Sequence, residues 1–158
     1  MFFSFFGQLL ACAPGLPGDF LRKAYYFLTL KYCSLHCTIG FGSILVHRLA
    51  IIEDRVSIGN YAIIGAAHIK NGCEIGSRVS IPSGKKQHAK NGEGKWTAFV
   101  PSETIQITIQ NDVWIGEGAI VMADVGRGSL VGAGSVVIDP IPESVVAAGN
   151  PSKVVKNI

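Results

Sequence analysis

The sequence predicts an all-β fold, a parallel β-helix of six-residue repeats preceded by a helical cap. Aliphatic residues recur every six positions over most of the chain, glycine often follows them, and a small or β-branched residue stands four places further on. A period of six fits neither an α-helix nor an ordinary strand. We therefore expect three short flat faces per coil, with the aliphatic side chains stacked in one continuous interior column.

The repeat extends from residue 39 to residue 137, with one interruption. Its aliphatic positions are Ile39, Leu45 and Ile51; Ile52, Ile58 and Ile64; Ile69, Ile75 and Ile81; Ile109, Ile115 and Val121; and Val131 and Val137. Its small or β-branched positions are Val56, Ala62, Val79, Val113, Ala119 and Ser135. Gly or Asn at the corners suits turns in which φ is positive or space is short. These repeats amount to about five coils.

A helical segment is expected before the repeats, which divides the chain into an apolar N-terminal part, residues 1–37, and a β-helix domain, residues 38–158. We expect Asp19 to cap a helix whose apolar face holds Leu21, Tyr25, Leu28 and Tyr32. We expect the apolar face of this helix to be buried against the end of the fold, a neighbouring subunit or a membrane surface. The opening stretch MFFSFFGQLLACAPGLPG has no basic residue and is broken by prolines, which argues against a cleaved secretory signal.

Composition narrows the class of protein. The chain has 158 residues, which suits one domain, and 48% hydrophobic with 16% charged residues excludes intrinsic disorder. No apolar run reaches the roughly 18 residues of a membrane span. A net charge of +3, scattered along the chain, gives no reason to expect nucleic acid as a partner. The four cysteines lack zinc-site spacing, so we expect free thiols, no metal and a cytoplasmic location.

The hexapeptide pattern resembles the left-handed β-helix of the hexapeptide-repeat acyltransferases. The resemblance runs from about Ile39 to the end and is most specific in NDVWIGEGAIVMADVGRGSLVGAGSVVIDPIPESVVAAGNPSKVVKNI. The handedness comes from this resemblance. Within the family, the chain is most similar to the sugar and xenobiotic O-acetyltransferases. One departure is VMADVGRGSLVG, which is shorter than the corresponding family segment and leaves the local coil geometry open.

The resemblance implies an acetyl-CoA-dependent O-acetyltransferase that modifies a sugar hydroxyl, in surface polysaccharide or lipopolysaccharide biosynthesis. It also implies a homotrimer with its active sites at the seams between subunits. Two alternatives stay open: acetylation of an amino sugar or an antibiotic, and a non-catalytic β-helix scaffold. A metal-dependent hydratase would need three converging histidines, which the spacing does not offer. The apolar N-terminal segment adds a peripheral contact with the inner membrane face as a hypothesis.

His88 is the candidate catalytic residue. It lies in the polar, Gly- and Lys-rich interruption of the repeat, the loop 82–104, and long loops inside a compact solenoid are usually functional. The resemblance implies that this loop reaches a neighbouring subunit, where an imidazole would remove the proton of the attacking hydroxyl. The plainer interpretation is a solvent-facing loop histidine. The group that orients His88 is a carboxylate, Asp124 or Glu103, or else a backbone carbonyl.

The resemblance also suggests where acetyl-CoA binds. It places Trp114, Gly116, Gly132, Ala133 and Gly134 along the coenzyme groove, with Lys153 and Lys156 near the phosphates. The plainer interpretation makes the glycines coil turns, the lysines a solvated face and Trp114 an apolar prop between subunits. His47 and His68 are either surface groups or part of an acceptor pocket.

Overall fold

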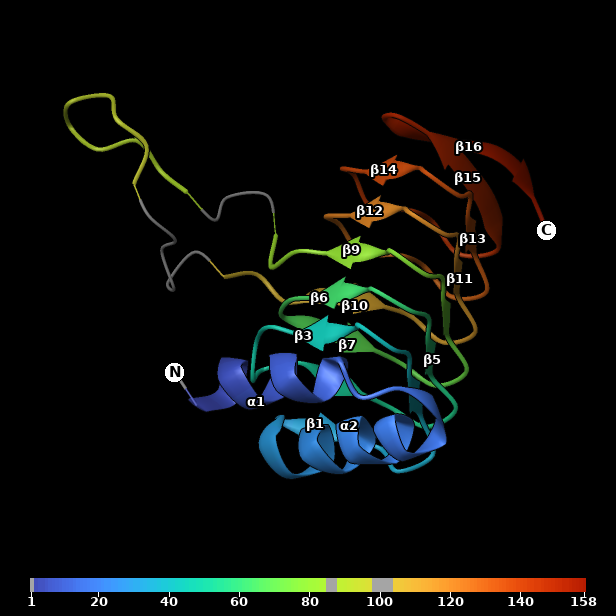
Figure 1. Ribbon diagram of the computed structural model, residues 1–158. Coiled ribbons are helices and arrows are strands. Elements are labelled where there is room, and N and C mark those ends of the chain that lie inside the picture. Colours follow the sequence, from blue (N-terminus) through green and yellow to red (C-terminus); the bar gives the residue numbers. More distant parts are fainter. Residues whose placement is uncertain (1, 85–87, 98–103) are drawn as a thin grey trace.

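The computed structural model describes residues 2–84, 88–97 and 104–158, and it shows a parallel β-helix with two helices over one end (Figure 1). The predicted fold class is confirmed. The solenoid has about six turns rather than five. The additional turn arises because the first coil already begins at Tyr32, before the predicted domain boundary at residue 38.

Three sheets form the faces of the solenoid. Sheet A contains β1 (Tyr32–Cys33), β4 (Ile51–Ile52), β7 (Ala67–Ile69) and β10 (Ile107–Ile109). Sheet B contains β2 (Thr38–Ile39), β5 (Ser57–Ile58), β8 (Glu74–Ile75), β11 (Trp114–Ile115), β13 (Leu130–Val131), β15 (Val145–Gly149) and β16 (Ser152–Asn157). Sheet C contains β3 (Ile44–Leu45), β6 (Ile63–Ile64), β9 (Ser80–Ile81), β12 (Ile120–Val121) and β14 (Val136–Val137). Their pairings are parallel, apart from the antiparallel pair β15 and β16.

The aliphatic column fills the bore of the solenoid, as the period predicted. Almost every aliphatic repeat position is buried, and so are all six small or β-branched positions. One assignment is wrong: Ile51 points outward, and Ile52 takes the interior place because the corner before β4 holds one additional residue. The shortened VMADVGRGSLVG passage still completes a coil, since the buried Val125 bridges Ile109 and Ile141.

Three cysteines occupy positions of the repeat itself. Cys33 takes the interior aliphatic place of the first coil, and Cys37 and Cys73 each stand four residues after an interior residue. All three are buried, and all four cysteines of the chain are free thiols. Burial raises the pKa of Cys73 to about 11, which keeps this thiol protonated at neutral pH. These cysteines are therefore small core residues.

The N-terminal helices α1 (Phe2–Ala11) and α2 (Gly15–Thr29) cover the first coil with a face that the sequence analysis did not predict. The buried residues of α2 are Gly18, Arg22 and Tyr26, whereas Leu21 and Leu28 are exposed. Asp19 is not the N-cap, because α2 already begins at Gly15. The carboxylate of Asp19 instead forms an ion pair with Arg22.

Arg22 and Tyr26 tie this cap to the coil beneath it. Arg22 Nε donates to the carbonyl oxygen of Ile39 (2.8 Å), and Nη1 donates to that of Ala13 (2.7 Å). The hydroxyl of Tyr26 accepts the N–H of Leu45 (3.0 Å), and burial raises the pKa of this tyrosine to about 12. Two polar side chains therefore satisfy backbone groups at the open end of the bore.

A column of glycines forms the corner between sheets B and C. Gly40, Gly59, Gly76 and Gly116 each lie against the backbone of the next coil. A Cβ atom on Gly116 would be 2.4 Å from the backbone nitrogen of Ala133. Neighbouring strands of a β-sheet lie about 4.8 Å apart, so only glycine fits at a corner where the backbones meet this closely.

Neither α1 nor α2, the helices of the described part of the chain, has the length and hydropathy of a membrane-spanning helix.

The Tyr26 bond can be tested with Tyr26→Phe. The change leaves the buried N–H of Leu45 without a partner, so we expect the free energy of unfolding to fall by about 1 to 3 kcal/mol. Denaturant unfolding followed by circular dichroism measures this. Tyr61→Phe, at an exposed ring, is the control and should change nothing. Equal unfolding midpoints for the two variants would contradict the proposed role of the hydroxyl.

The glycine corner can be tested with Gly116→Ala. Its methyl group would press on the backbone of the next coil, so we expect a loss of about 1 to 3 kcal/mol in the free energy of unfolding. Gly92→Ala is the matched control, because a Cβ atom there meets nothing within 4 Å. Thermal unfolding of both variants gives the comparison. If Gly116→Ala is as stable as Gly92→Ala, the corner can accommodate a methyl group and glycine is not required there.

Candidate active site

The loop between β9 and β10 contains a small hairpin, residues 88–97. The N–H of Asn91 donates to the carbonyl oxygen of Lys95 (2.9 Å), and that of Thr97 donates to Ala89 (2.8 Å). The turn lies between Asn91 and Lys95 and has a left-handed glycine, Gly94 (φ +76°), so the run Asn91-Gly92-Glu93-Gly94 is the sequence signal for a longer hairpin loop. The hairpin gives the candidate histidine a defined local support.

His88 stands at the base of this hairpin with its side chain exposed. Its Nδ1 lies 3.1 Å from the carbonyl oxygen of Thr97. A carbonyl oxygen only accepts hydrogen bonds, so Nδ1 carries the proton and Nε2 of the neutral ring keeps its lone pair. The hairpin thus fixes the tautomer in which Nε2 can take a proton.

This contact bears on the three candidates for orienting His88. The carboxylate of Asp124 accepts the N–H of Thr108 (2.7 Å) and so is committed to sheet A. Glu103 lies outside the described residues. The backbone carbonyl of Thr97 is the partner that the structure shows.

The predicted coenzyme-binding side chains share sheet B. Trp114 on β11 is exposed, in register with Leu130 of β13, while its neighbour Ile115 faces the bore. Lys153 and Lys156 lie on β16, at the edge of the same sheet, and both are exposed. An aromatic ring and two cations are therefore arranged on one face, toward the last coils.

The predicted glycines follow this face at the corner between sheets B and C. Packing against the next coil accounts for Gly116, and a Cβ atom on Gly132 would be 3.0 Å from Cβ of Ala148. Gly134 has a φ of +67° with open space around it, and Ala133 is exposed. The glycines are therefore coil turns, and the space beside Gly134 is open.

His88 and the sheet B residues lie on different sides of the solenoid. The loop leaves sheet C after β9 and returns to sheet A at β10. In Figure 1 the described hairpin extends to the left of the solenoid, whereas β11, β13, β15 and β16 lie to the right. One chain therefore does not bring the candidate base to the candidate coenzyme face.

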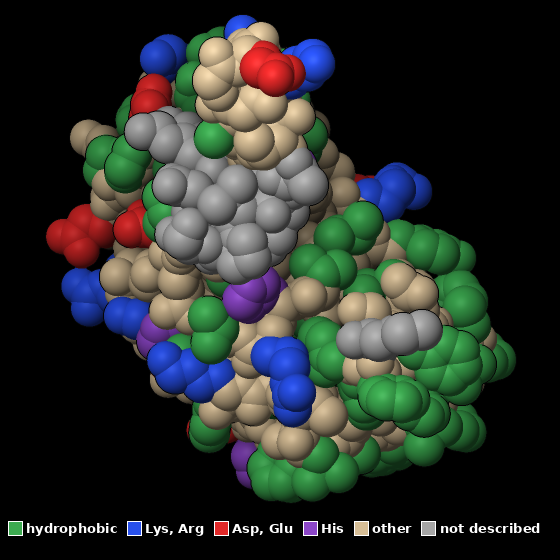
Figure 2. All heavy atoms as spheres, turned by 90° about the vertical axis from the view of Figure 1, so that its left-hand side faces the viewer, with side chains coloured by type: hydrophobic (Ala, Val, Ile, Leu, Met, Phe, Trp, Pro, Cys, Tyr) green, Lys and Arg blue, Asp and Glu red, His purple; other side chains and the backbone are tan. Residues whose placement is uncertain are grey.

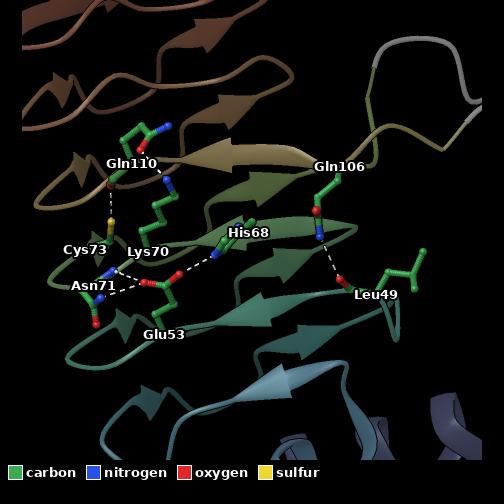
Figure 3. A network of polar contacts seen from close by, with 8 residues as sticks. All are labelled: Leu49, Glu53, His68, Lys70, Asn71, Cys73, Gln106 and Gln110. Carbon is green, nitrogen blue, oxygen red and sulfur yellow. Dashed lines mark hydrogen bonds and ion pairs between the residues drawn. The ribbon is translucent and has the colours of Figure 1, made fainter.

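The other histidines have local partners or none. His47 Nδ1 accepts the N–H of Leu49 (3.2 Å), which fits a surface turn. His68 Nε2 lies 2.5 Å from Glu53 Oε1, a pairing that the sequence analysis missed because fifteen residues separate the two (Figure 3). Within the described residues, no three His, Cys, Asp or Glu side chains are grouped so that they could hold a metal ion.

Comparison of sequences finds acetyltransferases. The chain is 48% identical over 113 residues to the galactoside O-acetyltransferase of Escherichia coli, a match that covers 70% of this chain and 48% of the relative. It is 47% identical over 60 residues to a 2,3,4,5-tetrahydropyridine-2,6-dicarboxylate N-acetyltransferase of Clostridium perfringens, covering 37% of this chain and 25% of that enzyme. The chain thus spans about half the length, or less, of these curated relatives. No family model matches.

Comparison of structures finds the same fold. A maltose O-acetyltransferase from Clostridium difficile 630 superposes with a TM-score of 0.80 at 18% identity, covering 99% of this chain and 84% of the other. A hexapeptide-repeat acetyltransferase from Vibrio cholerae, solved with acetyl coenzyme A, gives 0.65 at 18% identity, covering 98% and 85%. The sequence match over 70% of this chain and the shared β-helix show that the chain resembles the hexapeptide-repeat acetyltransferases and has their fold.

Proposed function

We propose that the protein is an acetyl-CoA-dependent O-acetyltransferase that acetylates a sugar hydroxyl, with His88 as the general base. The observation that carries the proposal is the Thr97 contact, which leaves Nε2 of an exposed imidazole free to accept a proton. The similarity to acetyltransferases supports the reaction class, and the fixed tautomer supplies a chemically competent residue.

The reaction follows from this arrangement. The sugar hydroxyl oxygen attacks the thioester carbonyl carbon while Nε2 of His88 takes the hydroxyl proton. The tetrahedral intermediate then collapses, the carbon–sulfur bond breaks, and the imidazolium returns the proton to the coenzyme A thiolate. Backbone N–H groups of the adjoining coil would stabilise the oxyanion, a contribution of about 3 to 4 kcal/mol per donor in other enzymes. No covalent acyl-enzyme is required.

Acetyl-CoA would bind along sheet B and its corner. The small residues Gly132, Ala133 and Gly134 would admit the extended pantetheine arm. The exposed ring of Trp114 offers an apolar contact, and Lys153 and Lys156 offer charge to the phosphates. Lysine attracts phosphate as a point charge without the bidentate geometry of arginine, so we expect binding that weakens steeply with salt.

The active form would be a homotrimer in which the hairpin of one copy reaches sheet B of the next. The support is the separation within one chain: the hairpin and the coenzyme face lie on different sides of the solenoid (Figure 1). In a trimer with three equivalent interfaces, each active site would combine the His88 hairpin of one copy with the coenzyme face of its neighbour.

The acceptor would be a sugar hydroxyl of a surface polysaccharide or lipopolysaccharide. The names of the similar galactoside and maltose O-acetyltransferases support a sugar acceptor. An amino sugar or an antibiotic is the nearest alternative, supported by the similarity to an N-acetyltransferase. A non-catalytic scaffold is the other alternative, and the competent tautomer of His88 argues against it.

The reaction can be tested by following thiol release from acetyl-CoA with a panel of glycan and nucleotide-sugar acceptors. We expect acceptor-dependent release that falls about 10²- to 10⁴-fold in His88→Ala, since a general base is lost. His36→Ala is the matched control, because His36 is also exposed and forms no described side-chain hydrogen bond. Full activity in His88→Ala would place the base elsewhere, and failure to bind acetyl-CoA would favour the scaffold.

We also propose that the N-terminal helices attach the protein to an anionic membrane surface. The exposed apolar residues are Phe2, Phe5, Phe6 and Leu9 on α1 and Leu16, Phe20, Leu21, Phe27 and Leu28 on α2. Figure 2 shows hydrophobic side chains gathered around this part of the molecule. Arg22 is buried and paired with Asp19, which leaves Lys23, Lys31 and Arg48 as the cations of the first 52 residues. Apolar residues flanked by cations fit an anionic bilayer.

Liposome flotation tests the attachment. We expect the wild type to float with vesicles that contain phosphatidylserine, less with neutral vesicles, and the double variant Phe2→Ser/Phe5→Ser to stay at the bottom. Val155→Ser/Ile158→Ser, which removes exposed apolar residues at the other end of the solenoid, should float like the wild type. A wild type that does not float would contradict membrane attachment. So would a Phe2→Ser/Phe5→Ser variant that still floats but no longer self-associates.

A further inference from the structure

A hollow on the outer face of sheet A includes none of the residues proposed above as the general base or for acetyl-CoA binding. It has a volume of about 390 Å³ and is lined by Tyr32, Ile51, Glu53, Asp54, His68 and Asn71. These residues come from β1, β4 and β7 and from the turns that follow β4 and β7. A hollow of this size matches the lower range of small-molecule sites.

The carboxylate of Glu53 is held by both of its oxygens (Figure 3). Oε1 is 2.5 Å from His68 Nε2, while Oε2 accepts the backbone N–H of Asn71 (3.2 Å) and its side-chain Nδ2 (2.8 Å). Only about a quarter of either side chain in the His68–Glu53 pair is exposed. The hollow is therefore lined by polar groups that are already oriented.

This arrangement leaves one nitrogen of His68 available. Since a carboxylate accepts, Nε2 donates to Glu53, and Nδ1 of the neutral ring keeps a lone pair. Within residues 2–84, 88–97 and 104–158, no hydrogen bond to Nδ1 of His68 is formed. The coil itself does not require this pair, because Tyr32, Ile51 and Thr108 occupy the equivalent outward position on β1, β4 and β10.

The lining indicates the chemistry of a ligand. The ring of Tyr32, half exposed beside Ile51, gives an apolar wall, and the carboxylates, amide and imidazole give several hydrogen-bonding groups. An uncharged sugar matches both, with its C–H face on the ring and its hydroxyls on the polar groups. The carboxylates of Glu53 and Asp54 disfavour an anionic ligand. Lys70, in the turn after β7, does not line the hollow, and its Nζ donates to Gln110 Oε1 (2.8 Å).

The loop that carries His88 is fastened to this same face. After the hairpin the chain enters β10, and Gln106 Nε2 donates to the carbonyl oxygen of Leu49, just before β4 (3.0 Å) (Figure 3). The hollow and the end of the loop thus share sheet A. A glycan in the hollow would lie on the face from which the loop extends.

We propose that this hollow is a binding subsite for an uncharged sugar unit of the acceptor, in which Glu53 positions His68 as a hydrogen-bonding partner. The proposal rests on the proposed sugar O-acetyltransferase function and adds the charge class of the acceptor. It assigns no proton transfer to His68. A second copy of the chain is the competing occupant of this face.

Sugar binding without acetyl-CoA tests the subsite directly. We expect saturation-transfer NMR on the full chain to detect methyl galactoside and methyl glucoside, and methyl glucuronide to bind more weakly. Glu53→Gln and His68→Gln should each weaken the neutral sugars about tenfold, because a fixed acceptor or its partner is lost. Tyr32→Ala should do the same. His47→Gln and Tyr61→Ala, at exposed sites outside the hollow, are the matched controls.

Several results would overturn the subsite. One is a wild type that binds no neutral sugar, and another is binding that survives in Glu53→Gln and His68→Gln. A third is loss of the oligomer in these variants by native mass spectrometry, which would make the hollow an interface. Acetyl transfer is measured separately. If Glu53→Gln and His68→Gln both release thiol at the normal rate with an unchanged acceptor KM, the subsite is refuted and the proposed reaction is not. Sugar binding without any thiol release refutes the proposed reaction alone.

Discussion

The aliphatic column inside the coils is the constraint on which the rest of the structure depends. Each coil contributes about three interior side chains, and none of them is shielded until the next coil is stacked on it. Stacking at strand distance brings the corners into backbone contact, which is why glycine recurs at Gly40, Gly59, Gly76 and Gly116. The interior is therefore filled by structural side chains. Catalytic and ligand-binding groups are therefore restricted to the outer faces, the corners and the loops.

The same constraint creates two open ends that need different covers. At the C-terminal end, β16 pairs antiparallel with β15 and forms the last strand of sheet B. At the other end, α2 places Arg22 and Tyr26 over the bore, where they satisfy backbone groups of the first coil. A helix that uses its polar side chains inward leaves its apolar side chains outward. The exposed phenylalanines and leucines of the cap are thus a consequence of how the bore is closed.

The sequence predicted most of the structure where the six-residue period operates, apart from Ile51, and less of it elsewhere. Coils, interior residues and small positions follow from a six-residue repeat, because one geometry is reused. The buried face of α2 could not be predicted from hydrophobicity, since Arg22 and Tyr26 are buried through hydrogen bonds to carbonyl and N–H groups of other segments. Cys33 escaped notice because a thiol fills an interior place that the pattern assigns to Ile or Val. The Glu53–His68 pair depends on the length of one coil, which brings residues 53 and 68 together.

The candidate base illustrates how a rigid scaffold can present a defined group on a projecting loop. The proton on Nδ1 of His88 is fixed by Thr97, a residue of the same hairpin, so the tautomer does not depend on the coils or on whatever surface Nε2 meets. Asp124, which the sequence made a candidate for this task, instead accepts the N–H of Thr108 in β10, in the preceding coil. The hairpin therefore carries an already oriented imidazole away from its own solenoid. In the proposed enzyme, selectivity for an acceptor would then come from the fixed outer faces, where polar side chains such as Glu53 are held by the spacing of the coils.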